Sequence, residues 1–397
     1  MTKREELKVE LEKLVTIFPE DNRIDLEKML GGFLWKENPQ GEKCLNIINQ
    51  ISEYEIFDNQ TQWIGGSGKP FTFKHLLDWL LNRSRKTSSK KAISELDFYT
   101  SNSEITVELV QLLKGSMSKK PFRFSNGVLY IDINTIYKTP SFLNNSHLAK
   151  KLSHISFETP SNNHYTGLFI TEFPHSVSHV KNGEKYKKED TIPLEKLQDT
   201  RFCLSLVLST KDSLYSLGTS IYLPDNIPQI PYSGQSWQKD MSKESMFCNE
   251  ITDIDFEKAN KVLVKFEQLD SLSKNKLRIP LERLNNFGSE EPLVDRAIEL
   301  RICLESIFLN DGNKEQLRFR LALRAALFLG ENLIERKEIF KTIKTSYDIT
   351  STAVHSGKLP NKSKTNILFK AADLAQLALI KLITKGIVNW EDLELKT

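Results

Sequence analysis

One histidine lies in a context that could support proton transfer. His355 belongs to the segment TSTAVHSG (350–357), in which Gly357 is well placed to end a helix. An imidazole that titrates near neutral pH can take and return a proton, as hydrolysis or attack by an RNA 2′-hydroxyl requires. Among the seven histidines of the chain, His355 is therefore the candidate for a chemical role, and a purely structural histidine is the alternative.

The segment before His355 carries an excess of positive charge. From Lys314 to Lys344 the sequence has eight Lys or Arg residues and four Glu residues. Such a surplus favours the binding of a polyanion. The candidate phosphate-binding residues are the cations at four positions of this segment, namely Arg318, Arg320, Lys341 and Lys344.

The same region predicts an ion pair between two helices. An apolar stripe at helical spacing runs from Leu317 to Phe328, and Arg324 lies within it. A buried arginine cannot lose its charge, so it needs an acidic partner. Glu305 lies in the matching stripe of the preceding predicted helix. We therefore predict a Glu305–Arg324 pair, whose role could be limited to fixing helix register.

Two other patterns match known binding motifs only in part. The segment GGSGK (65–69) lacks the first glycine and the final Ser or Thr of a phosphate-binding loop, because Trp63 and Pro70 occupy those positions. A flexible turn is the better interpretation. His175 and His179 have the spacing of a helical metal site, but the proline and lysines around them favour a surface loop. We expect no metal site.

Basic residues also gather in two loops, Arg83–Lys91 and Lys181–Lys188. Either loop could contact phosphate, although exposed loops of this composition are common. The four cysteines are widely scattered and are expected to be buried apolar residues of a reducing cytosol. No apolar run could span a membrane, and the amphipathic N-terminus is unlike a signal peptide, so we expect a cytoplasmic protein without a cofactor.

The elements that would position these residues fall into three regions. Residues 1–118 have helical periodicity, residues 119–250 change toward the period of strands, and residues 251–397 return to long helices. Strands are predicted at 122–124, 128–133, 167–173, 202–209 and 214–223. Helices are predicted at 256–270, 292–309, 314–330, 333–346 and 364–385. The fold class is thus mainly α with a smaller β-containing middle domain, and the C-terminal helices form an antiparallel bundle.

Three C-terminal segments resemble the HEPN superfamily and are most similar to its ApeA-like branch. They comprise residues 295–305, 320–326 and 347–357, and the resemblance covers roughly residues 275–390. It implies a small helical bundle that forms a homodimer and cleaves RNA without a metal. It also implies a role in a bacterial antiphage-defence or toxin system, with RNA (transfer RNA included) as the substrate. The N-terminal regions would sense a trigger or regulate the C-terminal domain, and a partner protein of the same system could take part.

In HEPN domains the active site carries an arginine, then a short variable stretch, then a histidine. On this sequence the histidine corresponds to His355 and the arginine position to Thr350. The resemblance makes His355 the general acid and base, with Tyr347, Asp348 and Thr350 lining the site. Threonine cannot clamp a phosphate as arginine does, because it offers one hydroxyl and no charge.

The threonine leaves several interpretations open. Lys344 or Arg320 could replace the arginine in space, which would preserve catalysis. Otherwise the domain is catalytically degenerate and serves as a dimerisation or RNA-binding scaffold in a defence complex. A third interpretation assigns nucleic-acid binding to the basic loops of the first two regions.

Overall fold

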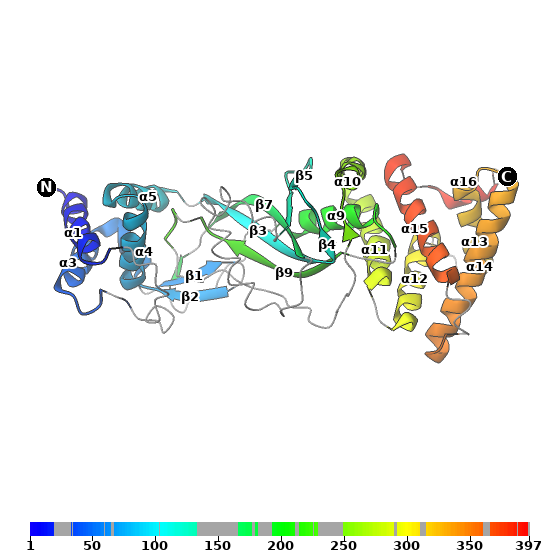
Figure 1. Ribbon diagram of the computed structural model, residues 1–397, viewed down its shortest axis with the longest axis horizontal. Coiled ribbons are helices and arrows are strands. Elements are labelled where there is room, and N and C mark those ends of the chain that lie inside the picture. Colours follow the sequence, from blue (N-terminus) through cyan, green and yellow to red (C-terminus); the bar gives the residue numbers. More distant parts are fainter. Residues whose placement is uncertain are drawn as a thin grey trace.

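The computed structural model is an elongated molecule with three groups of elements in chain order, N-terminal helices, a central sheet and C-terminal helices (Figure 1). The two ends of the chain lie at opposite ends of its long axis. The structure describes residues 1–19, 33, 35–58, 60–64, 67–102, 104–132, 166–176, 179–181, 193–210, 214–224, 226–228, 249–289, 292–309, 315–359, 366–386 and 388–395.

Short helices with marked N-caps form the N-terminal group. Its elements are α1 (Lys3–Ile17), α3 (Pro39–Ile48), the 3-10 helix η1 (Ser52–Phe57), α4 (Phe73–Lys86) and α5 (Ser89–Ser101). Thr2 and Glu5 close a capping box at the start of α1, which satisfies amide groups that the helix itself leaves free. The helices pack on a shared core that includes Leu11, Tyr54 and Leu80.

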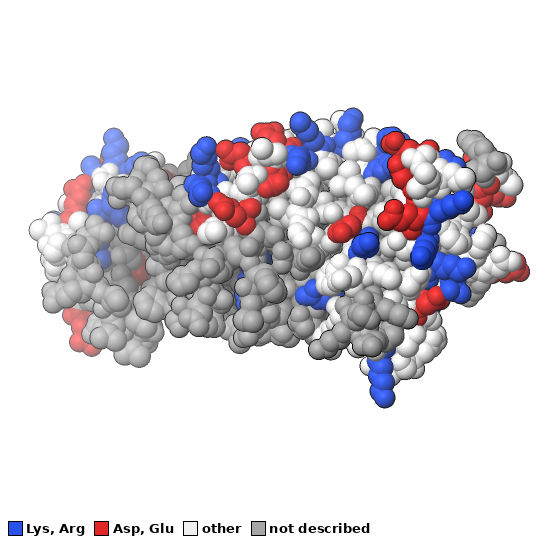
Figure 2. Space-filling view, turned by 45° about the vertical axis from the view of Figure 1, so that its right-hand side comes forward, with Lys and Arg blue, Asp and Glu red and all other residues white. Residues whose placement is uncertain are grey.

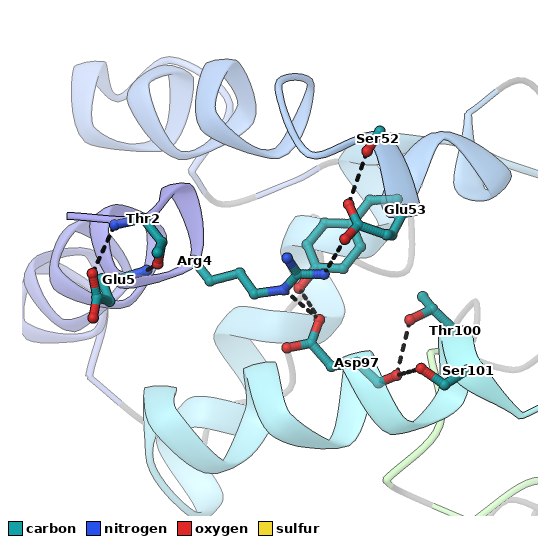
Figure 3. Close-up of polar contacts among 9 residues, drawn as sticks. Thr2, Arg4, Glu5, Ser52, Glu53, Asp97, Thr100 and Ser101 are labelled. Atoms are coloured by element: carbon teal, nitrogen blue, oxygen red, sulfur yellow. Dashed lines mark hydrogen bonds and ion pairs between the residues drawn. The ribbon is translucent and has the colours of Figure 1, made fainter.

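One arginine ties three of these elements together. The Arg4 guanidinium on α1 donates to Glu53 of η1 and to Asp97 of α5, each at 2.9 Å (Figure 3). The Tyr54 hydroxyl donates to the same Asp97 carboxylate at 2.9 Å. Both carboxylates raise the pKa of Arg4, so the charge is permanent and the cluster holds the helices in place.

The central sheet is antiparallel, with the strand order β5-β6-β7-β3-β9. Its strands are β3 (Glu104–Lys114), β5 (Phe122–Arg123), β6 (Leu129–Asp132), β7 (Thr166–Ser176) and β9 (Tyr215–Tyr222). From Leu109 to Leu113 every residue of β3 is buried, so this end of the sheet is covered on both faces. Two smaller sheets pair β1 (Gln60–Ile64), β2 (Ser67–Phe71) and β8 (His179–Lys181), and β4 (Ser116–Met117) with β10 (Asn249–Glu250).

Two sequence-based assignments near this sheet are wrong. Residues 1–118 were expected to be helical, yet the chain already enters the sheet at β3 and forms the β1–β2 hairpin before it. The predicted strand 202–209 is wrong, because its first half belongs to helix α9 (Leu194–Ser205) and its second half is turn and irregular structure. Residues 104–114 and 202–209 are both rich in apolar residues, and the periodicity of such a run does not separate a strand from a buried helix. The predicted strands at 122–124, 128–133, 167–173 and 214–223 are confirmed in substance.

The hairpin and the histidine pair differ from the binding motifs that they resemble. The β1–β2 pairing, with Trp63 opposite Gly68, puts the described part of this segment, residues 67–69, in a strand, whereas a phosphate-binding loop leads from a strand into a helix. His175 lies in β7 and His179 in β8, so the expected surface loop is wrong and the helical spacing that a metal would need is missing.

The C-terminal group consists of long helices, as predicted. They are α10 (Asp253–Glu267), α11 (Ser271–Ser289), α12 (Leu293–Phe308), α13 (Leu317–Leu329), α14 (Leu333–Ser356), α15 (Asn366–Lys385) and α16 (Trp390–Leu395). Asn332 caps the start of α14, and Gly357 ends it with a left-handed backbone (φ 62°), as the sequence predicts. The helix is continuous where the sequence predicts an end near residue 346.

Helix α11 is absent from the sequence prediction because Pro280 interrupts its pattern. Cys303 of α12 donates its thiol to the Pro280 carbonyl at 3.4 Å. Burial raises the pKa of this thiol, so Cys303 stays protonated and unreactive. Cys44 and Cys203 are buried as expected, and Cys248 lies outside the described residues.

The sheet and the C-terminal helices share one apolar core. Phe256 of α10 stacks on Phe122 of β5 with ring centroids 4.9 Å apart, and it also contacts Tyr130 of β6. Arg278 of α11 pairs with Asp199 of α9 at 2.7 Å. In the described ranges, no helix combines the length and apolar character that a bilayer-spanning segment requires.

Candidate functional site

A strip of charged side chains follows the outer face of α14. Lys337, Lys341, Lys344, Asp348 and His355 fall within an arc of about 60° around the helix axis, at 3.6 residues per turn. Four of these residues are exposed, and Lys344 is half-buried. The strip extends over roughly 27 Å, from the rise of 1.5 Å per residue. Figure 2 shows basic side chains, with acidic ones among them, gathered over the C-terminal helices.

The one carboxylate in the strip is paired with a cation from the neighbouring helix. Arg318 of α13 donates to Asp348, and both side chains are about half exposed. This contact brings Arg318 to the strip and offsets the Asp348 charge. We call the five α14 residues together with Arg318 the α14 strip; its cations outnumber its carboxylates.

A second polar cluster lies beside the strip, between α12 and α14. Arg301 of α12 donates to Glu305 at 2.9 Å and to the Tyr347 hydroxyl at 3.2 Å. Its guanidinium also lies 4.9 Å from the centre of the Tyr347 ring. Burial, the main cause, raises the pKa of Tyr347, so its hydroxyl keeps its proton at neutral pH.

The predicted Glu305–Arg324 pair is wrong. Arg324 is fully buried, as predicted, but its Nε donates to Glu394 of α16 at 2.6 Å and its Nη1 to the Phe308 carbonyl at 2.6 Å. Glu305 instead pairs with Arg301, one turn earlier on its own helix. The short α16 folds back against α13 and supplies the acidic group, an interaction between distant segments that helical periodicity cannot reveal.

Thr350 does not line a surface site. Its side chain is fully buried, and its hydroxyl donates to the Tyr347 carbonyl at 3.1 Å, within the same helix. The residue lies on the core side of α14, whereas His355 lies on the exposed side. Thr350 therefore cannot contact a phosphate there, and the assignment of this residue to the site is wrong.

Arg320 also differs from its predicted role. Its side chain is largely buried and lies 3.6 Å from Glu394, on the same carboxylate that holds Arg324. This position directs Arg320 toward α16 and away from the strip. Of the four predicted phosphate-binding residues, Arg318, Lys341 and Lys344 lie together and Arg320 does not.

His355 lies at the exposed end of α14, in its last turn. It shares the helix face of Asp348, two turns away. Within the described part of the chain, no hydrogen bond or ion pair holds the imidazole. The ring is therefore open to a ligand from solvent, while Tyr347 points toward Arg301 and contributes no proton acceptor beside it.

Sequence reasoning missed three residues of this region. Lys337 lies one turn before Lys341, and this spacing could have identified it. Arg301 and Glu394 gave no such signal, because their roles depend on which helices pack together. Among the residues that the structure describes, no three His, Cys, Asp or Glu side chains gather as they would around a metal ion.

The predicted basic loop at 83–91 is wrong, because its cations lie in the last turns of α4 and at the start of α5. Two of these cations have a structural role. Arg83 forms a bidentate pair with Glu95, at 2.5 and 2.7 Å, and Arg85 donates to the Phe18 carbonyl at 2.7 Å. These contacts join α4 to α5 and to the end of α1. Lys90 and Lys91 remain exposed. The lysines from 182 to 188 in the second loop lie outside the described residues.

Comparison with protein-family models, with curated proteins and with solved structures found no match for this chain. The HEPN resemblance of the C-terminal helices therefore stays a prediction.

Proposed function

We propose that the C-terminal bundle binds RNA through the α14 strip. The observation that carries the proposal is the alignment of three lysines on one exposed helix face, with Arg318 beside them and the one carboxylate already paired. Lysine and arginine bind nucleic acid by neutralising phosphates and releasing counterions. The resemblance to HEPN domains suggests RNA as the polyanion.

Of the two roles open to a HEPN-like domain, the structure favours the RNA-binding scaffold. The arginine position of the motif holds Thr350, which is buried, and Arg320 is engaged by Glu394. Lys344 lies in the strip and could still replace the motif arginine. However, its ammonium contacts the Phe340 ring, 5.5 Å from the ring centre. A scaffold of this kind would act in a bacterial defence complex, as a homodimer or with a partner protein.

The test measures RNA binding by the full-length protein over a range of salt concentrations, with fluorescence anisotropy as the readout. The slope of log affinity against log salt is negative for such binding. We expect the double variant Lys337→Gln/Lys341→Gln to reduce its magnitude by about 1.4 to 1.8, since two phosphate contacts are lost. The double variant Lys90→Gln/Lys91→Gln removes two exposed lysines of α5 and serves as the matched control. Equal slopes for all three proteins would contradict the proposal.

Metal-independent RNA cleavage is the second candidate function. It is favoured by the exposure of His355 at the end of the α14 strip, where the imidazole could act as general acid and base. Incubation of labelled RNA with the wild type and with His355→Ala, both in the presence of a chelator, tests it. Cleavage that disappears in the variant supports this function, and cleavage that persists rules out His355.

A further inference from the structure

An exposed aromatic ring lies next to the α14 strip. Phe319 of α13 follows Arg318 directly in sequence, and 46% of its surface is accessible. Its ring packs against Phe340 of α14 with centroids 5.6 Å apart and an interplanar angle of 71°. The edge-on contact is of the favourable kind, and it leaves nearly half of Phe319 open to solvent.

Contacts of its two neighbours, Phe340 and Arg318, place this ring within reach of the cations. Phe340, which supports Phe319, also carries the Lys344 ammonium over its ring. Arg318, the neighbour of Phe319, reaches Asp348 in the strip. An aromatic surface and a row of cations therefore lie side by side, on two helices that pack against each other.

We propose that Phe319 stacks on a nucleobase, so that this surface selects single-stranded over duplex RNA. The inference rests on the proposed RNA binding and adds the residue that distinguishes single-stranded from double-stranded RNA. Proteins that bind single strands combine a cationic track for the backbone with aromatic rings for the bases. In a duplex the base faces are covered by neighbouring bases, so an exposed ring has no unpaired base to stack on.

The surface suits RNA better than a second copy of the same face. Two such faces in contact would bring the lysines of one strip against those of the other, which disfavours association. A flexible polyanion can instead follow the lysines while one base turns toward Phe319.

Fluorescence anisotropy with full-length protein tests the inference. The probes are a labelled 12-nucleotide single-stranded oligouridine and a 12-base-pair RNA duplex, roughly the length of a binding site for single strands. Phe319→Leu keeps an apolar side chain and removes the ring, while Phe319→Tyr keeps the ring. Phe98→Leu is the matched control, since Phe98 is 65% exposed on α5, far from the strip (Figure 1).

We expect Phe319→Leu to weaken binding of the single strand about tenfold and to leave the salt slope unchanged, because stacking carries no counterions. Binding of the duplex should not change, and Phe319→Tyr and Phe98→Leu should bind like the wild type. Equal affinity of Phe319→Leu and wild type for the single strand, or an equal loss for single strand and duplex, overturns the stacking role while RNA binding stands. Absence of binding to either probe by the wild type overturns the proposed function and the inference with it.

Discussion

At the scale of single residues, Arg324 shows how a buried charge is stabilised. The guanidinium is fully buried, so it requires both a counter-charge and hydrogen-bond acceptors. Glu394 supplies the charge, the Phe308 carbonyl accepts a further hydrogen bond, and the Trp390 ring lies 6.0 Å from the guanidinium carbon. Two of these three residues come from α16, so Arg324 also holds the C-terminal helix in place.

Glu394→Gln should lower the free energy of unfolding by about 3 kcal/mol, because it removes the carboxylate that compensates the buried Arg324 charge. Glu305→Gln should cost below about 1 kcal/mol, since the Glu305–Arg301 pair is partly exposed to solvent. Urea unfolding, monitored by circular dichroism, measures both free-energy changes. A similar loss in the two variants would show that Glu394 is not the main partner of Arg324.

His75 is the residue with the clearest pH dependence. Its Nδ1 accepts the Thr72 backbone N–H at 3.2 Å and so completes the N-terminal cap of α4. This bond requires a neutral imidazole. Burial beside Phe33 and Phe71 lowers the pKa of His75 below the ordinary 6.5. The unfolded chain therefore binds a proton at a higher pH than the folded protein does.

The contribution of His75 to stability is thus complete above about pH 6.5 and is lost as the pH falls toward the lowered pKa of the folded state. We expect the urea midpoint of the wild type to decrease as the pH is lowered from 7.5 to 5.5. His75→Gln keeps a capping acceptor that does not titrate, so part of this fall should disappear. A fall of the same size in the variant would assign the pH dependence to other groups.

At the scale of elements, close packing between strands depends on one glycine. A Cβ built at Gly167 of β7 would lie 2.5 Å from the Tyr130 ring and 2.6 Å from the Ser116 hydroxyl. Tyr130 and Ser116 are joined by a hydrogen bond of 3.1 Å and are both fully buried. Strands β4, β6 and β7 therefore meet at a point where only glycine fits.

Gly167→Ala should destabilise the protein by about 1–3 kcal/mol, the usual cost of overpacking a core. The double variant Gly167→Ala/Tyr130→Leu removes the ring that the new methyl group would meet. In a double-mutant cycle based on urea unfolding, we expect the double variant to be destabilised by less than the sum of the two single variants. Strictly additive effects would mean that the ring and the glycine do not compete for this space.

At the scale of the whole molecule, the N-terminal helices and the α14 strip lie at opposite ends of a long axis (Figure 1). The exposed lysines of α5 and those of α14 therefore cannot bind one short oligonucleotide together. This separation lets the two basic regions be tested independently in the intact chain.

Hydrogen exchange in the presence of a short RNA should show new protection in α13 and α14 and none in α4 and α5, because only the first pair presents the strip. The N-terminal helices provide an internal reference in the same experiment. Protection confined to residues 73–101 would transfer RNA binding to the N-terminal group and contradict the proposal.

Local patterns in the sequence determined much of the element order. The long helices of the C-terminal group follow from apolar spacing and from end signals such as Gly357, since both are local properties of the chain. The middle strands follow from alternation and from the turn at Ser125–Gly127. The segment that became α9 shows the limit, because a short apolar run fits either element until its neighbours are known.

The sequence by itself also determined that Arg324 is buried and that Lys341 and Lys344 share a helix face, because residues on one helix have fixed angles to each other. That His355 lies on the same face follows only from the unbroken course of α14 to Ser356. Only the tertiary structure decided that Arg324 pairs with Glu394 rather than Glu305, that Thr350 faces the core, and that Phe319 lies beside the strip. These facts depend on how separate helices pack together, and contacts between segments distant in the chain leave no periodic signal within either one.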